Sequence, residues 1–269
     1  MLNKEKKITV VMSVYNHEEH VGFAIESVIN QTHKNLEFII INDGSKDSSL
    51  RVIKKYKKLD SRIIVVDQDN IGLTKSLNVG IKLSTGDYIA RQDADDRSSL
   101  NRLEKQLEIV KKFDLDIITS SAFNNKKVVP NELIFKFNHL NLLRTGNVFI
   151  HGTFLISKSV FEKQIYNERY QYAQDFKFIL DAVSNNFKIG TILDPLYHLG
   201  NIGTSISNTK NKEQTQCAIM ALGDTFGEDR PFRFINMFNR RLKIVARLCL
   251  LIFLSKKNES YEFKIIRKA

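Results

Sequence analysis

Three acidic residues within four positions, Asp93, Asp95 and Asp96, form the part of the sequence with the clearest chemical potential. They directly follow an apolar run in the segment DYIARQDADD. Because side chains alternate along an extended segment, Asp93 and Asp95 are expected on the same side, with Ala94 between them. Paired carboxylates suit Mg²⁺ or Mn²⁺, and such a cation neutralises a departing diphosphate. Taken alone, the triplet fits equally well an acidic loop that caps the next helix.

Two more polar groups follow apolar runs. Tyr15 and Asn16 come after ITVVMSVY, and Asp43-Gly44-Ser45 comes after LEFIIIN. Asp43 can accept a hydrogen bond from a base N–H or a ribose hydroxyl, and Gly44 lets a ligand approach the backbone closely. The alternative for Asp-Gly-Ser alone is an ordinary turn.

The segment DNIGLTKSLNVG lies between these groups. Gly72 precedes an expected helix whose first turn can face phosphates, and Lys75 and Asn78 share one helical face. A plain surface helix that begins at a glycine turn is the alternative interpretation.

Elements that could position these groups alternate along the chain. Expected strands cover Ile8–Tyr15, Leu36–Asn42, RIIVVDQ, DYIARQD, Asp116–Ser121, His151–Ser157, Phe187–Ile192 and Pro195–His198. Expected helices cover Glu19–Gln31, a stretch from Ser48, LTKSLNVGIKLS, Leu100–Phe113 and Gln174–Val183, and residues Asn124–Asn147 are expected to be loop-rich. This order predicts an α/β fold with a mainly parallel sheet, flanked by helices, that binds ligands at the carboxyl ends of its strands.

The positive charge of the chain is concentrated at its C-terminus. The net charge is +11, and the residues from Arg230 to Ala269 hold eleven basic and two acidic side chains. A nucleic-acid enzyme carries its positive field around the cleft, so no nucleic-acid partner is expected. Apolar and basic residues recur there at helical spacing, which suits an anionic membrane surface. Packing on the catalytic domain, or on a second subunit in a homo-oligomer, is the alternative.

The two cysteines, Cys217 and Cys249, have no metal-ligand spacing, and the N-terminus shows no signal for secretion. The run Leu248–Leu254 is too short to span a bilayer. We therefore expect a cytoplasmic protein that attaches peripherally to the inner face of the cell membrane.

Four blocks occur in one order: VVMSVYN, FIIINDGSKD, DNIGLTKSLNVGIKLSTGDYIARQDADD and a later His…Gln-Asp segment. In this order they resemble the inverting family 2 glycosyltransferases, which have a GT-A fold. The resemblance covers about the first two thirds of the chain. It implies a nucleotide-sugar donor, usually a UDP-sugar, and a divalent cation, Mn²⁺ or Mg²⁺.

The resemblance also implies roles for particular residues. Asp43 pairs with the base, Asp93 contacts the ribose or the sugar, and Asp95 is the direct metal ligand. Other residues are placed around the nucleotide and its phosphates: Tyr15, Asn16, Glu18, Gly44, Ser45, Gly72, Lys75, Asn78, Arg91 and Ala94.

An inverting transfer also needs a base on the acceptor side. The family commonly supplies it from a Glu-Asp pair that opens a helix. Here the pair is Gln174-Asp175, so Asp175 is the expected base and Gln174 is a departure from the family pattern. His151 is expected either to line the cleft or to be structural. His198 is a candidate metal ligand, although the basic residue usual in its loop is missing.

We therefore expect a GT-A catalytic domain over residues 1–205, with a nucleotide-binding half (1–98) and an acceptor half (99–205). A helical C-terminal appendage with a basic amphipathic tail is expected over residues 206–269. The expected activity is transfer of a sugar to a glycan or to a lipid-linked saccharide, in bacterial surface polysaccharide synthesis. The alternatives are a nucleotidyltransferase that makes sugar nucleotides, and a non-enzymatic basic adaptor for membrane or nucleic acid.

Overall fold

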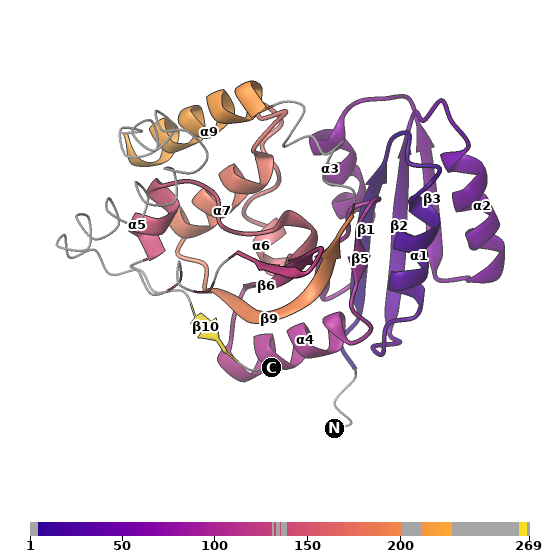
Figure 1. The fold of residues 1–269 in the computed structure, drawn as a ribbon, viewed down its shortest axis with the longest axis horizontal. Helices are drawn as coiled ribbons and strands as arrows, with labels where there is room; N and C mark the ends of the chain where they lie inside the picture. The colour runs from indigo at the N-terminus through magenta and orange to yellow at the C-terminus, as the bar shows by residue number, and fades with distance from the viewer. Residues whose placement is uncertain are drawn as a thin grey trace.

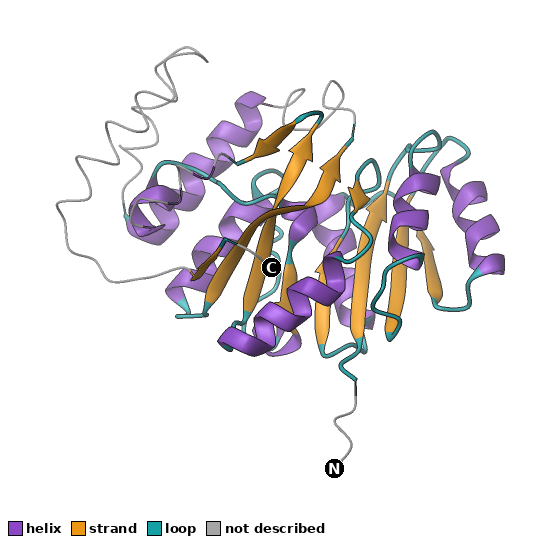
Figure 2. Ribbon diagram, turned by 60° about the horizontal axis from the view of Figure 1, so that its bottom comes forward, coloured by secondary structure: helices purple, strands orange, loops and turns teal. Residues whose placement is uncertain are grey.

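The computed structural model describes residues 5–130, 132, 135, 139–200, 211–227 and 264–267 of the 269-residue chain. Within these ranges one sheet has helices against both of its faces (Figures 1 and 2). Its strands are β1 (Ile8–Val14), β2 (Leu36–Asp43), β3 (Ile63–Gln68), β4 (Tyr88–Arg91), β5 (Arg97–Ser98), β6 (Ile117–Asn124), β7 (Lys127–Val129), β8 (Leu155–Ser157), β9 (Ile189–Leu199) and β10 (Lys264–Ile266). The helices are α1 (Val21–Ile29), α2 (Ser49–Leu59), α3 (Leu73–Leu83), α4 (Arg102–Phe113), α5 (His139–Arg144), α6 (Lys158–Phe161), α7 (Gln174–Ser184) and α9 (Asn211–Phe226).

The first four strands form the parallel half of the sheet. β1 lies between β2 and β4, β3 lies outside β2, and all three pairings are parallel. β2 is buried along its whole length and β1 nearly so, which explains why both are nearly continuous apolar runs in the sequence. Their carboxyl ends meet at one edge, where the loops that carry Tyr15, Asp43 and Asp93 begin.

The second half of the sheet is mixed. β8 runs antiparallel to both β4 and β6, β9 runs parallel to β6, and the full order is β10-β9-β6-β8-β4-β1-β2-β3. The short strand β5 pairs antiparallel with the end of β9, where Arg97 is opposite His198. This pairing brings the end of β9 beside the Asp93–Asp96 turn.

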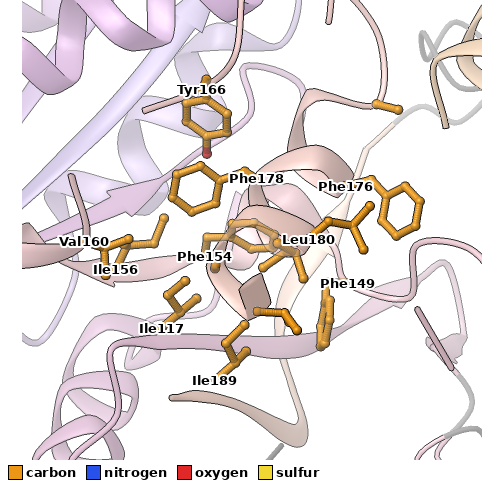
Figure 3. Close-up of a cluster of buried hydrophobic side chains, with 14 of the residues drawn as sticks. Ile117, Phe149, Phe154, Ile156, Val160, Tyr166, Phe176, Phe178, Leu180 and Ile189 are labelled. Atoms are coloured by element: carbon orange, nitrogen blue, oxygen red, sulfur yellow. The ribbon is translucent and has the colours of Figure 1, made fainter. Parts of the chain in front are cut away.

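Alternate side chains of the central strands fill two hydrophobic clusters, one on each face. Val10 and Met12 pack with residues of α1, α2 and α4, whereas Val11 belongs to the cluster that contains residues of α3, α7 and α9. Figure 3 shows the cluster that contains Val11 and residues of α3, α7 and α9. In it the rings of Tyr166 and Phe178 pack with their centroids 4.8 Å apart. Burial of each such side chain contributes on the order of 1.5–3 kcal/mol, so these clusters are the main source of fold stability.

The expected parallel sheet with flanking helices is confirmed, and several element boundaries differ. The two extended pieces expected at Phe187–Ile192 and Pro195–His198 form one strand, β9. The segment Asn124–Asn147 contains β7 and α5 and is not only loop. The expected strand His151–Ser157 is wrong in its first half, which is a 3-10 helix (His151–Thr153). There the Thr153 hydroxyl donates to the Ile150 carbonyl at 2.7 Å, and this local turn replaces extended backbone.

The described parts of the C-terminal region, residues 211–227 and 264–267, pack on the rest of the fold. α9 packs on α7 and buries Leu222, and the Tyr170 hydroxyl donates to Asp224 Oδ2 at 2.7 Å. Residues 264–266, expected to be helical, form β10, which pairs with β9 at the sheet edge (Figure 1). Most of the basic tail lies outside the described residues, so its membrane attachment stays a prediction. Among the described helices, none is long and apolar enough to cross a bilayer.

Candidate active site

The Asp93–Asp96 turn lies at the carboxyl end of β4, as expected. Arg91 is 4% exposed, and its guanidinium donates to Asp93 Oδ1 at 2.5 Å. Burial raises the pKa of Asp93, and the charge of Arg91 opposes that rise. Burial and the carboxylates of Asp93 and Asp95 raise the pKa of Asp96 to about 8. Three carboxyl groups thus share one turn, and among the described residues the turn has one ion pair, between Arg91 and Asp93, an arrangement that suits a bound cation.

Asp95 faces a cavity of about 600 Å³ that is also lined by His20, Phe23, Arg97, His198 and Gly200. In the described part of the chain, no hydrogen bond or ion pair engages the Asp95 carboxylate. The exposed His198 ring stacks on Phe123, with centroids 5.0 Å apart, and its Nε2 is 3.3 Å from Ser99 Oγ. The structure thus brings both candidate metal ligands to one cavity.

The ligand set suits a cation that keeps water and phosphate in its coordination sphere. Among the described residues, no three His, Cys, Asp or Glu side chains are grouped to hold a metal. A closed zinc site needs such a group, whereas Mg²⁺ is held through one or two carboxylates together with substrate phosphates. The half-exposed Asp95 carboxylate fits that second pattern.

Asp43 ends β2 and is 2% exposed. Its Oδ1 accepts hydrogen bonds from the Ile71 backbone N–H at 2.9 Å and from Gln68 Nε2 at 3.0 Å, and its Oδ2 accepts from the Gly72 N–H at 3.0 Å. The carboxylate thus fixes the loop before α3 against the end of β2. Gly44 has φ +70°, and a Cβ there would lie 2.6 Å from the Asn70 nitrogen, so only glycine fits this close approach.

The loops after β1 and β2 bind each other through the expected nucleotide-site residues. Asn16 Oδ1 accepts from the Lys46 N–H at 2.8 Å, and Ser45 Oγ accepts from the Asn16 N–H at 3.1 Å. Glu18 Oε2 accepts from the Ser48 N–H at 2.7 Å. Tyr15 stays 46% exposed at this edge. The loops are therefore pre-ordered, with an aromatic ring available to a ligand.

Lys75 and Asn78 share one face of α3, as expected, but they line a different cavity from Asp95. The Asn78 amide donates to the Tyr166 carbonyl at 2.9 Å and accepts from the Tyr166 N–H at 3.1 Å. Asn78 therefore joins α3 to the loop before α7. A contact of either side chain with donor phosphates stays a prediction.

Asp175 lies in the first turn of α7, next to the buried Gln174, and its Oδ2 accepts from Asn147 Nδ2 at 2.7 Å. Burial raises the pKa of Asp175 to about 6, and the nearby charge of Asp93 adds to the rise. The two carboxylates come from separate elements and are close enough for the charge of Asp93 to act on Asp175. A single pocket that joins Asp43, Asp95 and Asp175 stays a prediction. A base with a pKa near 6 is suited to accept a proton at neutral pH.

His151 is tied to its protein neighbours. Its Nε2 is 2.8 Å from the Tyr166 hydroxyl, and its ring packs edge-on to Tyr166 and Phe154. Burial, and then the charge of Arg91, lower the pKa of His151 well below its usual range. A neutral histidine in this environment favours the structural alternative.

Sequence reasoning missed a buried polar network behind the acidic turn. Tyr197 on β9, Arg102 on α4 and Gln92 are fully buried and contact the turn or each other. Arg102 stands among mostly polar residues in SLNRLEKQL, so the sequence carried no signal that its side chain is buried.

The fold and site together define a nucleotide-dependent transferase: a GT-A sheet with acidic residues gathered at its strand ends. Residues 9–165, more than half of the chain, match Glycosyl transferase family 2. The chain therefore belongs to family 2 of the glycosyltransferases, enzymes that use nucleotide sugars. This confirms the resemblance seen in the sequence blocks and disfavours both the nucleotidyltransferase and the adaptor.

One relative in sequence and two solved structures are consistent with this family. An uncharacterized glycosyltransferase of Haemophilus influenzae is 31% identical over 229 residues, which cover 78% of this chain and 70% of that relative. S. aureus TarS 1–349 in complex with UDP-GlcNAc has TM-score 0.64 and 18% identity, covering 91% of this chain and 81% of TarS 1–349. The mannosyltransferase PcManGT of Pyrobaculum calidifontis, in complex with GDP-Man and Mn²⁺, has TM-score 0.69 and 11% identity. The match covers 95% of this chain and 76% of PcManGT. Both structures share the fold.

Proposed function

We propose that the chain transfers a sugar, with inversion, from a UDP-sugar to a hydroxyl of a glycan or glycolipid acceptor in bacterial surface polysaccharide synthesis. The observation that carries the proposal is a buried carboxylate, Asp175, that opens α7 within electrostatic reach of the acidic turn. Asp175, with a pKa raised to about 6, lies near enough to Asp93 for the two charges to interact. A base beside an acidic turn is what a displacement of diphosphate requires.

The residues at the turn fit a divalent cation. Asp95 would hold it, with His198 as a second ligand from the same cavity. When bound, Mn²⁺ or Mg²⁺ supplies positive charge to the departing diphosphate. The Mn²⁺ and GDP-Man of PcManGT and the UDP-GlcNAc of TarS support a nucleotide-sugar donor. Asp43 is assigned to the uracil side because it ends β2 beside the exposed Tyr15.

Asp175 acts on the acceptor. Its carboxylate takes the proton from the attacking hydroxyl while the oxygen forms a bond to the anomeric carbon. The bond between that carbon and the diphosphate breaks on the opposite face, and the electron pair leaves with UDP. Asn147 orients the carboxylate through its 2.7 Å hydrogen bond, so that one oxygen stays directed at the acceptor. One carboxylate is sufficient, so the Gln174 departure leaves the chemistry intact.

The test is metal-dependent UDP release in the purified full chain, screened over UDP-sugars with Mn²⁺. We expect Asp95→Asn and Asp175→Asn to lower kcat by about 10²–10⁴-fold. Asp114→Asn is the matched control, because Asp114 is exposed and forms an ion pair with Lys188, away from the turn. Thermal unfolding checks that each variant is folded.

Full activity in folded Asp175→Asn would remove the base assignment. If folded Asp95→Asn had wild-type activity both with and without Mn²⁺, the assignment of Asp95 as a metal ligand would be wrong. Release of pyrophosphate from a nucleoside triphosphate and a sugar phosphate would instead restore the nucleotidyltransferase.

A further inference from the structure

Tyr197 projects from β9 onto the acidic turn. It is 0% exposed, and its hydroxyl accepts a hydrogen bond from the Asp93 backbone N–H at 2.9 Å and another from Gln92 Nε2 at 3.1 Å. Both donors belong to the start of the turn. A phenylalanine would fill the same apolar space, so packing alone does not account for the hydroxyl. Without it, two donors in a buried environment would lose a partner.

The Tyr197 ring is held in place from two sides. The Arg102 guanidinium lies 5.3 Å from the ring centroid, and its Nη1 donates to the Arg91 carbonyl at 3.0 Å and to the Gly152 carbonyl. A Cβ on Gly152 would lie 2.3 Å from the Tyr197 hydroxyl oxygen. The absence of a side chain at Gly152 thus makes room for the hydroxyl.

The end of β9 also holds the far side of the turn. The Gly200 N–H donates to Asp96 Oδ1 at 2.7 Å, and a Cβ on Gly200 would lie 1.9 Å from the Asp95 carbonyl oxygen. Tyr197 and Gly200 therefore fix the residues on each side of Asp95. The Asp95 carboxylate itself takes no hydrogen bond from the described residues and lines the cavity.

We propose that Tyr197 is a positioning residue of the metal site, whose hydroxyl fixes the backbone of the Asp93–Asp96 turn so that Asp95 is aimed at the cavity before a cation binds. This inference rests on the proposed function, because it requires a divalent cation at Asp95. The acceptor half of the sheet, through β9, thereby sets the geometry of a site on the nucleotide half. Groups behind metal ligands typically change metal affinity by 10–100-fold when they are removed.

The experiment measures Mn²⁺ binding to the full chain in the presence of UDP, by electron paramagnetic resonance of free Mn²⁺. In Tyr197→Phe we expect Mn²⁺ affinity to fall about tenfold. UDP affinity without metal should stay unchanged. The apparent KM for Mn²⁺ should rise by a similar factor, and saturating Mn²⁺ should restore most of kcat.

Tyr170→Phe is the matched control, since it also removes a buried tyrosine hydroxyl with a side-chain partner, Asp224, away from the turn. It should keep wild-type Mn²⁺ affinity. If Tyr197→Phe does not fold, Ser98→Ala replaces it. Ser98 Oγ donates to Gln92 Oε1 at 2.6 Å and orients that amide, so its loss should weaken Mn²⁺ binding about threefold.

The outcomes separate the two proposals. Wild-type Mn²⁺ affinity in folded Tyr197→Phe, or in Ser98→Ala when it takes that place, overturns the positioning role alone. An equal loss in Tyr170→Phe also overturns it, because the effect would then be general destabilisation. Failure of the wild-type chain to bind Mn²⁺ with UDP contradicts the proposed function itself.

Discussion

At the scale of single residues, neighbouring groups set the protonation of the acidic side chains. Asp93, Asp96 and Asp175 all have a raised pKa, and burial is the largest cause for each. For Asp175, backbone N–H groups of the first turn of α7 and the Asn147 amide oppose the rise and leave the pKa at about 6. This balance keeps Asp175 ionised at neutral pH.

The pH dependence of kcat/KM should report Asp175. Because the base must be ionised, activity should fall as the pH drops below about 6. Asn147→Ala removes a hydrogen bond that lowers the pKa, so the acidic limb of the profile should move up by about one pH unit. The measurement is initial rate against pH with each variant.

Asn185→Ala provides the comparison for this profile. Asn185 ends the same helix and bonds Gln164 at 2.8 Å, away from Asp175. Its profile should match the wild type. If the acidic limb of the pH profile of Asn147→Ala stayed where it is in the wild type, Asp175 would not control the rate.

At the scale of elements, the amino ends of the parallel strands are joined by a buried carboxylate. Glu37 on β2 accepts hydrogen bonds from Lys7 Nζ at 2.6 Å, from Thr9 Oγ1 at 2.6 Å and from the Thr85 N–H at 2.7 Å. Burial raises the pKa of Glu37, but these bonds outweigh it and lower the pKa to about 2. The carboxylate thus links β1, β2 and the turn before β4 at the edge opposite the active site.

Glu37→Gln should lower the free energy of unfolding by roughly 2 kcal/mol at pH 7. The folded pKa lies below the usual value of 4.5, so this stabilisation is complete above pH 4.5 and is lost as the pH falls toward 2. The difference between variant and wild type should therefore shrink on acidification. Urea unfolding at several pH values measures it.

The exposed Glu108→Gln on α4 should change stability by less than about 0.5 kcal/mol at any of these pH values. A constant difference between Glu37→Gln and wild type from pH 7 to pH 3 would show that the stabilisation does not depend on the ionised carboxylate.

At the scale of the whole molecule, the C-terminal helix α9 is part of the catalytic domain's core. Leu222 is 1% exposed and lies in the same hydrophobic cluster as residues of α7, the helix that carries Asp175. The position of Asp175 therefore depends on packing against α9, and both helices follow the region that matches family 2.

Leu222→Ala should destabilise the protein by about 2–5 kcal/mol, because it leaves a cavity between α9 and α7. Leu59→Ala is the control, since Leu59 is 70% exposed at the end of α2 and should have little effect. Thermal and urea unfolding compare the two. If Leu222→Ala and Leu59→Ala lost equally little stability, α9 would not be packed on α7 as described.

The sequence alone determined the parallel half of the fold and the placement of the acidic residues at strand ends. Runs such as LEFIIIN are apolar because strands covered on both faces must be, and their carboxyl ends necessarily meet at one edge. The short helix at His151–Thr153 was not predictable, since one side-chain hydrogen bond decides it. The network of Tyr197, Arg102 and Gln92 was decided only by the tertiary structure, because it joins residues about a hundred positions apart. Local patterns encode periodicity and strand ends, whereas partners distant in the chain are fixed only when the sheet is assembled.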